Sequence, residues 1–165
     1  NGHEICSINP MGFQWFDLTR DDDGYVLKQS IKAEIKLIEF IDEVKKEFEL
    51  ENKQICLSGF SQGCMMSINL GLISNQEFSC IVGFSGKIIN ERDLKSRKKV
   101  STSTLLIHGD SDQVVHANYM LEAKDFLIRN NVEVETKIIK NCGHQIPVEA
   151  SSYALNYIKN NLDVK

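Results

Sequence analysis

The chain reads Gly59-Phe60-Ser61-Gln62-Gly63 directly after the apolar run Ile55-Cys56-Leu57 and ahead of a helical pattern. This is the pattern G-x-S-x-G at the junction of a strand and a helix. A sharp turn of this form holds a serine in a strained conformation with its hydroxyl exposed. Flanking glycines let the backbone pass close to its neighbours without a Cβ clash. The segment therefore predicts a nucleophile, Ser61, beside a helix N-terminus that favours developing negative charge.

Outward from this segment, strands and helices are predicted to alternate. Apolar runs predict strands at residues 55–58, 80–84, 104–108 and 132–139. Apolar residues spaced by three and four predict helices at residues 27–50, 64–73, 117–130 and 147–162. Residues 1–20, with Pro10 and Gly12, are predicted to be irregular. The alternation predicts one domain over residues 1–165, with a mostly parallel sheet and helices on both of its faces.

The composition of the chain restricts the type of domain, the partners and the cellular location that we expect. The 165 residues are 42% apolar and 25% charged, which is typical of one globular domain. A net charge of −4 argues against a nucleic-acid partner. We expect no membrane insertion, because no apolar run approaches a membrane span, and no signal peptide is visible. Five cysteines without a C-x-x-C pair favour the cytoplasm over a disulfide framework or a zinc site.

A serine hydroxyl needs a base, and the best candidate is His144. It lies in a loop between the last predicted strand and the last helix, and Gly143 is expected to let that loop turn tightly. The imidazole in turn needs a group that orients it, and Asp112 is the preferred candidate. Asp110 is the alternative, although its position favours a role in the turn.

Each candidate also has an ordinary structural interpretation. Ser61 could be a turn residue, His144 could bind backbone, and Asp112 could cap the helix that begins near Ala117. Three such motifs after three strands make that interpretation of the whole set much weaker. His108 is interpreted as structural.

Two further residues need an interpretation. Cys64 lies at a helix start, where a thiol pKa can be lowered, yet we expect it to pack and not to react. Trp15 is interpreted either as core or as the wall of a substrate pocket, and is our candidate for substrate binding.

The three motifs resemble the phospholipase/carboxylesterase family of α/β-hydrolases, which includes the acyl-protein thioesterases. The segment from Gly12 to Leu18 and the segment Phe84-Ser85-Gly86 are also similar to this family. The order Ser61, Asp112, His144 is the chain order of α/β-hydrolases. The resemblance covers nearly the whole chain and implies the α/β-hydrolase fold.

The resemblance implies a serine hydrolase that cleaves small acyl esters or thioesters, of carboxylesterase, lysophospholipase or acyl-thioesterase type. Ser61 would be the nucleophile, His144 the base and Asp112 the group that orients it. The backbone N–H of Gln62 would be one donor to the oxyanion. No metal or organic cofactor would be required.

The N-terminal part of the chain departs from the pattern of the family. Family members begin with further strands and a His-Gly loop that supplies a second oxyanion donor, and nothing before Ile5 matches that loop. We therefore expect either a chain that lacks its N-terminal strands or a weak enzyme, since one lost donor costs about 100- to 1000-fold in rate. An uncovered sheet edge invites pairing with a second copy as a homodimer, so the alternative function is binding or self-association. A dienelactone-hydrolase-like or peptidase-like enzyme is a third interpretation, and Ser61 in place of cysteine argues against the dienelactone type.

Overall fold

The computed structural model describes residues 1–17, 19–20 and 22–162. The chain forms two compact units, Asn1–Leu50 and Glu51–Lys165. The expectation of one domain over residues 1–165 stays a prediction.

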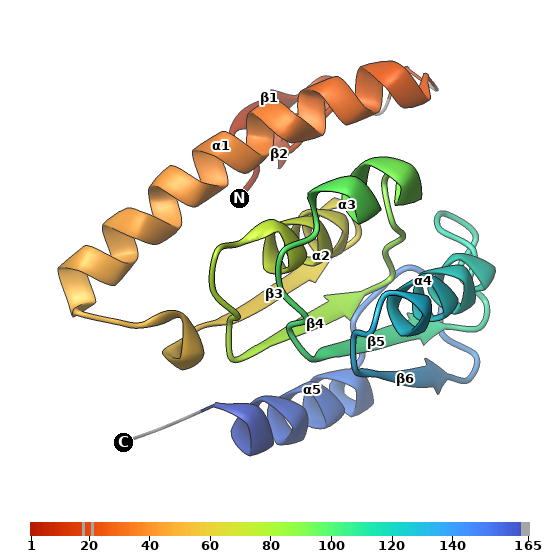
Figure 1. Cartoon of the computed structure of the whole chain (residues 1–165). Helices are drawn as coiled ribbons and strands as arrows, with labels where there is room; N and C mark the ends of the chain where they lie inside the picture. Colours follow the sequence, from red (N-terminus) through yellow and green to blue (C-terminus); the bar gives the residue numbers. More distant parts are fainter. Residues whose placement is uncertain (18, 21, 163–165) are drawn as a thin grey trace. The chain divides into compact units, whose positions relative to one another are not determined.

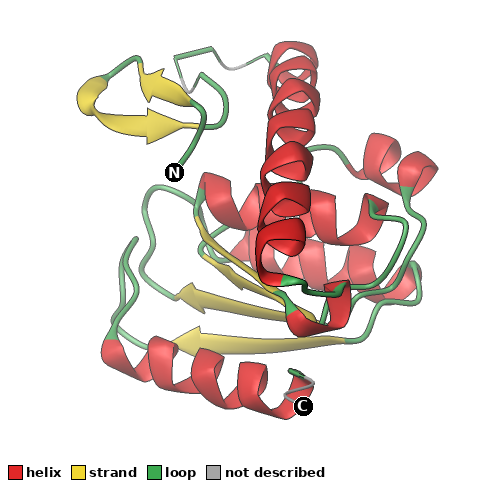
Figure 2. Ribbon diagram, turned by 90° about the vertical axis from the view of Figure 1, so that its left-hand side faces the viewer, coloured by secondary structure: helices red, strands yellow, loops and turns green. Residues whose placement is uncertain are grey.

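The first unit opens with an antiparallel hairpin of β1 (Glu4–Cys6) and β2 (Asn9–Gln14), in which Ile5 faces Phe13. Figure 2 draws this hairpin close to the N-terminus. The prediction of irregular structure was therefore wrong for these two segments. Pro10 lies within β2, and a strand that pairs on one side only can accept proline, because its other edge needs no N–H donor.

Helix α1 (Asp23–Phe48) forms the rest of the first unit. Asp22 caps it, because its carboxylate accepts a hydrogen bond from the Tyr25 N–H at 2.6 Å. The helix ends at Glu49, which has a left-handed φ of 53°. In the sequence, the run Asp21-Asp22-Asp23 offers candidate caps for this helix. Asp22 is confirmed as the cap, while Asp21 lies outside the described residues.

The second unit holds a parallel sheet with strand order β3-β4-β5-β6. Its strands are β3 (Cys56–Phe60), β4 (Cys80–Phe84), β5 (Thr104–Gly109) and β6 (Val134–Ile139). Its helices are α2 (Gln62–Ile73), α3 (Glu91–Arg97), α4 (Asn118–Arg129) and α5 (Val148–Asn161), with the short 3-10 helix η1 (Asn52–Gln54) before β3. Crossovers of one hand between sequential strands put the connecting helices on one face. Figure 1 shows α2 and α4 on that face and α5 on the other, which confirms the predicted fold class.

The core of the second unit follows the two-residue period of its strands. In β4, Cys80, Val82 and Phe84 point toward a cluster that includes Ala154 and Tyr157 of α5. The intervening Ile81 and Gly83 face α2, where Gly71 and Cys64 approach them. Both faces of β4 are therefore buried, as expected for a central strand of a parallel sheet.

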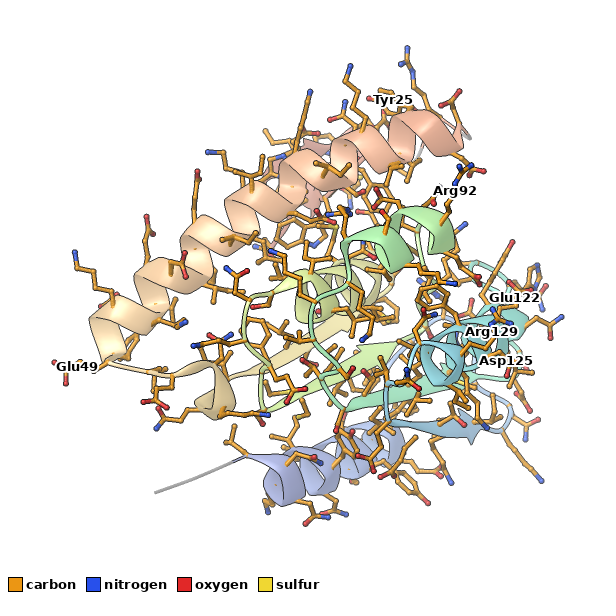
Figure 3. The ribbon with its side chains drawn as sticks, in the orientation of Figure 1. Tyr25, Glu49, Arg92, Glu122, Asp125 and Arg129 are labelled. Carbon is orange, nitrogen blue, oxygen red and sulfur yellow. The ribbon has the colours of Figure 1, made fainter. Side chains whose placement is uncertain are left out.

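Helix α4 has one buried and one charged side. Met120, Ala123, Phe126 and Leu127 are buried. Figure 3 shows Glu122, Asp125 and Arg129 pointing away from the sheet. The helical spacing predicted this division, and the observed helix begins and ends one residue inside the predicted range.

Candidate active site

Ser61 lies in the turn between β3 and α2, where its backbone has φ 54° and ψ −116°. Such a conformation is rare for a residue with a Cβ and costs about 1–3 kcal/mol. Hydrogen bonds on both sides hold it in place. The Ser61 N–H donates to the Phe84 carbonyl at 2.8 Å, and the Ser61 carbonyl accepts from the Met65 N–H at 3.2 Å.

The two glycines of the turn have different roles. A Cβ on Gly59 would collide with the Gly63 carbonyl group, so only glycine fits there. A Cβ on Gly63 would meet no atom within 4 Å, so the expectation of a close approach is wrong for this position. The close approach occurs instead at Gly86, where a Cβ would lie 2.6 Å from Cys64 Cβ and 3.1 Å from the Ser61 carbonyl oxygen.

Asp112 and His144 meet although 32 residues separate them in the chain. The His144 Nδ1 and Asp112 Oδ2 atoms are 2.8 Å apart. The other carboxylate oxygen accepts hydrogen bonds from the Val114 and Val115 N–H groups, each at 2.9 Å. Burial would raise the pKa of Asp112, but the hydrogen bonds from His144 and the two amides outweigh it and lower that pKa to about 2.

His144 also lies against the serine turn. Its ring centroid is 4.6 Å from that of Phe60, the residue before Ser61, and the two planes are inclined by 43°. The His144 side chain is 18% exposed, whereas the Asp112 side chain is fully buried. With Nδ1 directed to Asp112, Nε2 is the nitrogen left for proton transfer. The structure thus brings His144 to Asp112 and to the residue adjoining Ser61.

The loops that carry Asp112 and His144 are bonded to each other. The Asp110 N–H donates to the Ile139 carbonyl, and the Ser111 N–H donates to the Cys142 carbonyl, both at 3.0 Å. Asp110 itself is exposed and accepts a hydrogen bond from the Ser111 hydroxyl. The geometry therefore brings Asp112, and not the alternative Asp110, to His144.

The turn before His144 differs from the prediction. Asn141, with a φ of 53°, takes the left-handed conformation, and no described glycine has a positive φ. A Cβ on Gly143 would meet nothing within 4 Å. Asparagine tolerates the left-handed region better than most residues, so the turn does not depend on Gly143.

His108 is closer to the site than its structural interpretation implied. It is 1% exposed, and its Nε2–H donates to the Val115 carbonyl at 2.7 Å. The same nitrogen lies 3.4 Å from Asp112 Oδ2. In the sequence, His108 stands out only by its place near the end of a strand, four residues before Asp112.

The cysteines near the site are buried. Burial raises the pKa of the Cys64 thiol to about 12, partly offset by a hydrogen bond from the Gly86 backbone. The raised pKa and the packing against Gly83 and Gly86 agree with the expected structural role. The Cys142 thiol donates to backbone carbonyls within its own loop.

Two other predicted site residues are Gln62 and Trp15. Gln62 is the first residue of α2, so its N–H lies at the positive end of the helix dipole. Trp15 belongs to the first unit, where its ring centroid lies 6.2 Å from that of His3. Its assignment to substrate binding stays a prediction.

Two other kinds of feature, a metal site and a membrane-spanning helix, are absent from the described residues. No three His, Cys, Asp or Glu side chains among them are grouped so that they could hold a metal ion. None of the helices that these residues form combines the length and the apolar character needed to cross a membrane.

Comparison with known proteins gives a consistent result. A family model described as Phospholipase/Carboxylesterase matches residues 1–162. The chain is 26% identical over 159 residues to the esterase YpfH of Escherichia coli (strain K12), covering 93% of this chain and 65% of that protein. It is 30% identical over 115 residues to acyl-protein thioesterase 1 of Yarrowia lipolytica, covering 66% of this chain and 50% of that protein.

Solved structures agree with these relatives. The crystal structure of esterase PE8 superposes with a TM-score of 0.92 at 30% identity, covering 98% of this chain and 76% of that one. The chain spans about half to two thirds of the length of the two curated relatives.

Proposed function

The chain belongs to the phospholipase/carboxylesterase family, and we propose that it hydrolyses carboxylic esters or thioesters through an acyl-serine intermediate. One observation carries the proposal. A histidine bonded to a buried carboxylate lies against Phe60, directly beside the strained Ser61. A base that is itself oriented by a third group, next to a serine on a sharp turn, is the arrangement that activates a hydroxyl.

In the proposed mechanism, Ser61 Oγ attacks the acyl carbonyl and His144 Nε2 takes the hydroxyl proton. Asp112 keeps the proton of the neutral imidazole on Nδ1 and stabilises the imidazolium that forms. His144 then gives its proton to the leaving alcohol or thiol, which departs and leaves the acyl-serine. Water, deprotonated by His144, attacks that ester, and His144 then gives this proton to Ser61 Oγ, which releases the acid and free Ser61.

The oxyanion of each tetrahedral intermediate needs donors, and we propose the Gln62 N–H as one of them. It lies at the start of α2, where the helix dipole favours negative charge. The proposed mechanism calls for no metal or organic cofactor. The proposed substrates are small-molecule acyl esters or thioesters, and the cysteine pattern supports a cytoplasmic site of action.

Acyl transfer from p-nitrophenyl esters and acyl thioesters tests the proposal. We expect Ser61→Ala and His144→Ala each to lower kcat by roughly 10⁶-fold, close to the background rate, because these residues act as one unit. Ser58→Ala, an exposed serine of the same strand, is the matched control and should keep full activity. Activity that survives Ser61→Ala would exclude Ser61 as the nucleophile.

A second candidate function is binding or self-association by a domain of low activity. The observation that favours it is the place of β3, which is a terminal strand of the described sheet. A terminal strand presents one row of backbone groups to a further strand. An inactive chain that forms concentration-dependent dimers would support this candidate over the esterase.

A further inference from the structure

We propose that His108 is a positioning residue for Asp112, because it anchors the loop that aims the carboxylate at His144. The catalytic consequence of this role rests on the proposed function. The positioning role does not rest on the proposed function, because it concerns the hydrogen bond between Asp112 and His144. That hydrogen bond can be observed without any substrate.

Val115 is held by hydrogen bonds at both its N–H and its carbonyl group. Its N–H donates to Asp112 Oδ1 at 2.9 Å, and its carbonyl accepts from His108 Nε2–H at 2.7 Å. A carbonyl can only accept, so the neutral His108 ring must carry its proton on Nε2. Through Val115, the imidazole of His108 therefore fixes the amide that binds the carboxylate.

His108 itself is held by the sheet. It lies in β5, which pairs with β4 on one side and β6 on the other, and its register partner in β6 is Ile138. The donor is therefore on a rigid element, while its acceptor is in the loop that follows. A fixed point of this kind is what a loop needs if it is to hold a side chain to a few tenths of an ångström.

The two carboxylate oxygens of Asp112 have different hydrogen-bond partners. Oδ1 is bound by the Val114 and Val115 amides, which leaves Oδ2 directed to His144 Nδ1. His108 Nε2 is 3.4 Å from that same Oδ2 and so borders it on a second side. Rotation of the carboxylate would exchange its two oxygens, and the anchored amides oppose that rotation.

Burial makes the hydrogen bond from His108 to the Val115 carbonyl hard to replace. The side chains of His108 and Asp112 are 1% and 0% exposed. Solvent therefore has no ready access to the Val115 carbonyl if the imidazole is removed, and a buried carbonyl without a donor is unfavourable. The loop is then expected to shift toward a new donor and to carry Asp112 with it.

The test compares His108→Gln with His108→Met. The two side chains have similar length, but only glutamine keeps an N–H donor that can reach the Val115 carbonyl. In the proton NMR spectrum, we expect the downfield signal of the His144 Nδ1–H bound to Asp112 in the unmodified chain and in His108→Gln. We expect it to be lost in His108→Met, with kcat/KM for a p-nitrophenyl ester lowered by about 100-fold, as for other misplacements near 1 Å.

The pH profile separates positioning from general destabilisation. A looser carboxylate supports the imidazolium less well, so the acid limb of kcat/KM should move to lower pH in His108→Met. Thr102→Val is the matched control, because it removes another buried donor to a carbonyl, from Thr102 Oγ1 to Gly71 at 2.9 Å. It should lower stability while leaving the NMR signal and the acid limb unchanged.

Retention of the downfield signal and of the acid limb in His108→Met would overturn the proposal. If that variant does not fold, His108→Asn replaces it, since its shorter amide cannot reach the Val115 carbonyl, and the same loss of signal is expected. If the unmodified chain proves inactive, the esterase proposal fails, and the NMR comparison still decides the role of His108.

Discussion

Ser61, the proposed nucleophile, has a strained backbone conformation. Its φ of 54° and ψ of −116° are open to glycine at little cost. Relief of about 1–3 kcal/mol of strain exceeds the entropy cost of glycine, about 0.5–1 kcal/mol. We therefore predict that Ser61→Gly is more stable than Ser61→Ala by about 1 kcal/mol in urea unfolding.

The matched pair for this comparison is Ser58→Gly and Ser58→Ala, three residues earlier in β3. There the backbone is extended, so glycine should be the less stable of the two by about 0.5–1 kcal/mol. The same order of stability at both positions would contradict the strain argument.

The lowered pKa of Asp112 predicts how the free energy of unfolding depends on pH. Its pKa is lowered from 3.8 to about 2 in the folded chain, which corresponds to about 2 kcal/mol at neutral pH. A depressed pKa means that this contribution is complete above about pH 5 and is lost as the pH falls through 2. We predict that the stability gap between the unmodified chain and Asp112→Asn closes over that range, measured by urea unfolding at successive pH values.

Asp110→Asn serves as the control for this experiment, because it removes an exposed carboxylate from the same loop. Its effect should be small and should not follow the same curve. A gap for Asp112→Asn that stays constant from pH 6 to pH 2 would show that the ionised carboxylate does not stabilise the fold.

At the scale of the elements, one part of the contact between α2 and β4 is made by Gly83 of β4, which faces the sulfur atom of Cys64 in α2. A Cβ on Gly83 would collide with Cys64 Sγ and would lie 3.1 Å from Leu106 Cδ2, but 3.6 Å from Cys64 Cβ. We predict that Gly83→Ala destabilises the chain by about 1–3 kcal/mol. Cys64→Ala should recover much of that loss, with a coupling energy of about 1 kcal/mol or more in a double-mutant cycle.

Gly86→Ala provides the contrast for this cycle. Its Cβ would collide with Cys64 Sγ, and it would also lie 2.6 Å from Cys64 Cβ and 3.1 Å from the Ser61 carbonyl oxygen. Cys64→Ala removes only the first of these three contacts, so the recovery is expected to be smaller than at Gly83. Equal recovery at both glycines would mean that the helix moves as a whole and that the sulfur contact is not decisive.

The elements themselves were predictable to different degrees. Strand β4 matches its predicted range because five buried apolar residues stand between polar segments. The hairpin of β1 and β2 was missed, since Pro10 is a breaker in most strands and only the one-sided pairing makes it acceptable.

In the candidate site, Ser61, Asp112 and His144 could be selected because each follows a predicted strand. The anchor at His108 could not be read from the sequence, because it depends on a backbone carbonyl seven residues away. The tight turn of the loop was assigned to Gly143, whereas Asn141 is the residue of this loop that has a positive φ.

At the scale of the whole molecule, the terminal strand β3 predicts a mode of association. The Ser61 N–H points toward β4, and alternation along a strand then directs the Ser58 N–H to the opposite side. We predict concentration-dependent dimers by light scattering. Ser58→Pro should abolish them while keeping the β3–β4 pairing, because it removes only an outward donor.

The control for association is Ser58→Ala, which keeps the outward N–H and should dimerise like the unmodified chain. A single mass, equal to that of one chain at every concentration, would contradict pairing through β3. Retained esterase activity in a monomeric Ser58→Pro variant would separate the two candidate functions.

The hydrogen bonds from Asp110 to Ile139 and from Ser111 to Cys142 join the two loops after β5 and β6 into one block. An insertion or deletion in either loop would therefore change the register of both. Lineages of this fold should vary in length elsewhere around the sheet before they vary here. A designer who transfers the paired Asp112 and His144 to another scaffold must move residues 109–115 and 139–145 as a single graft.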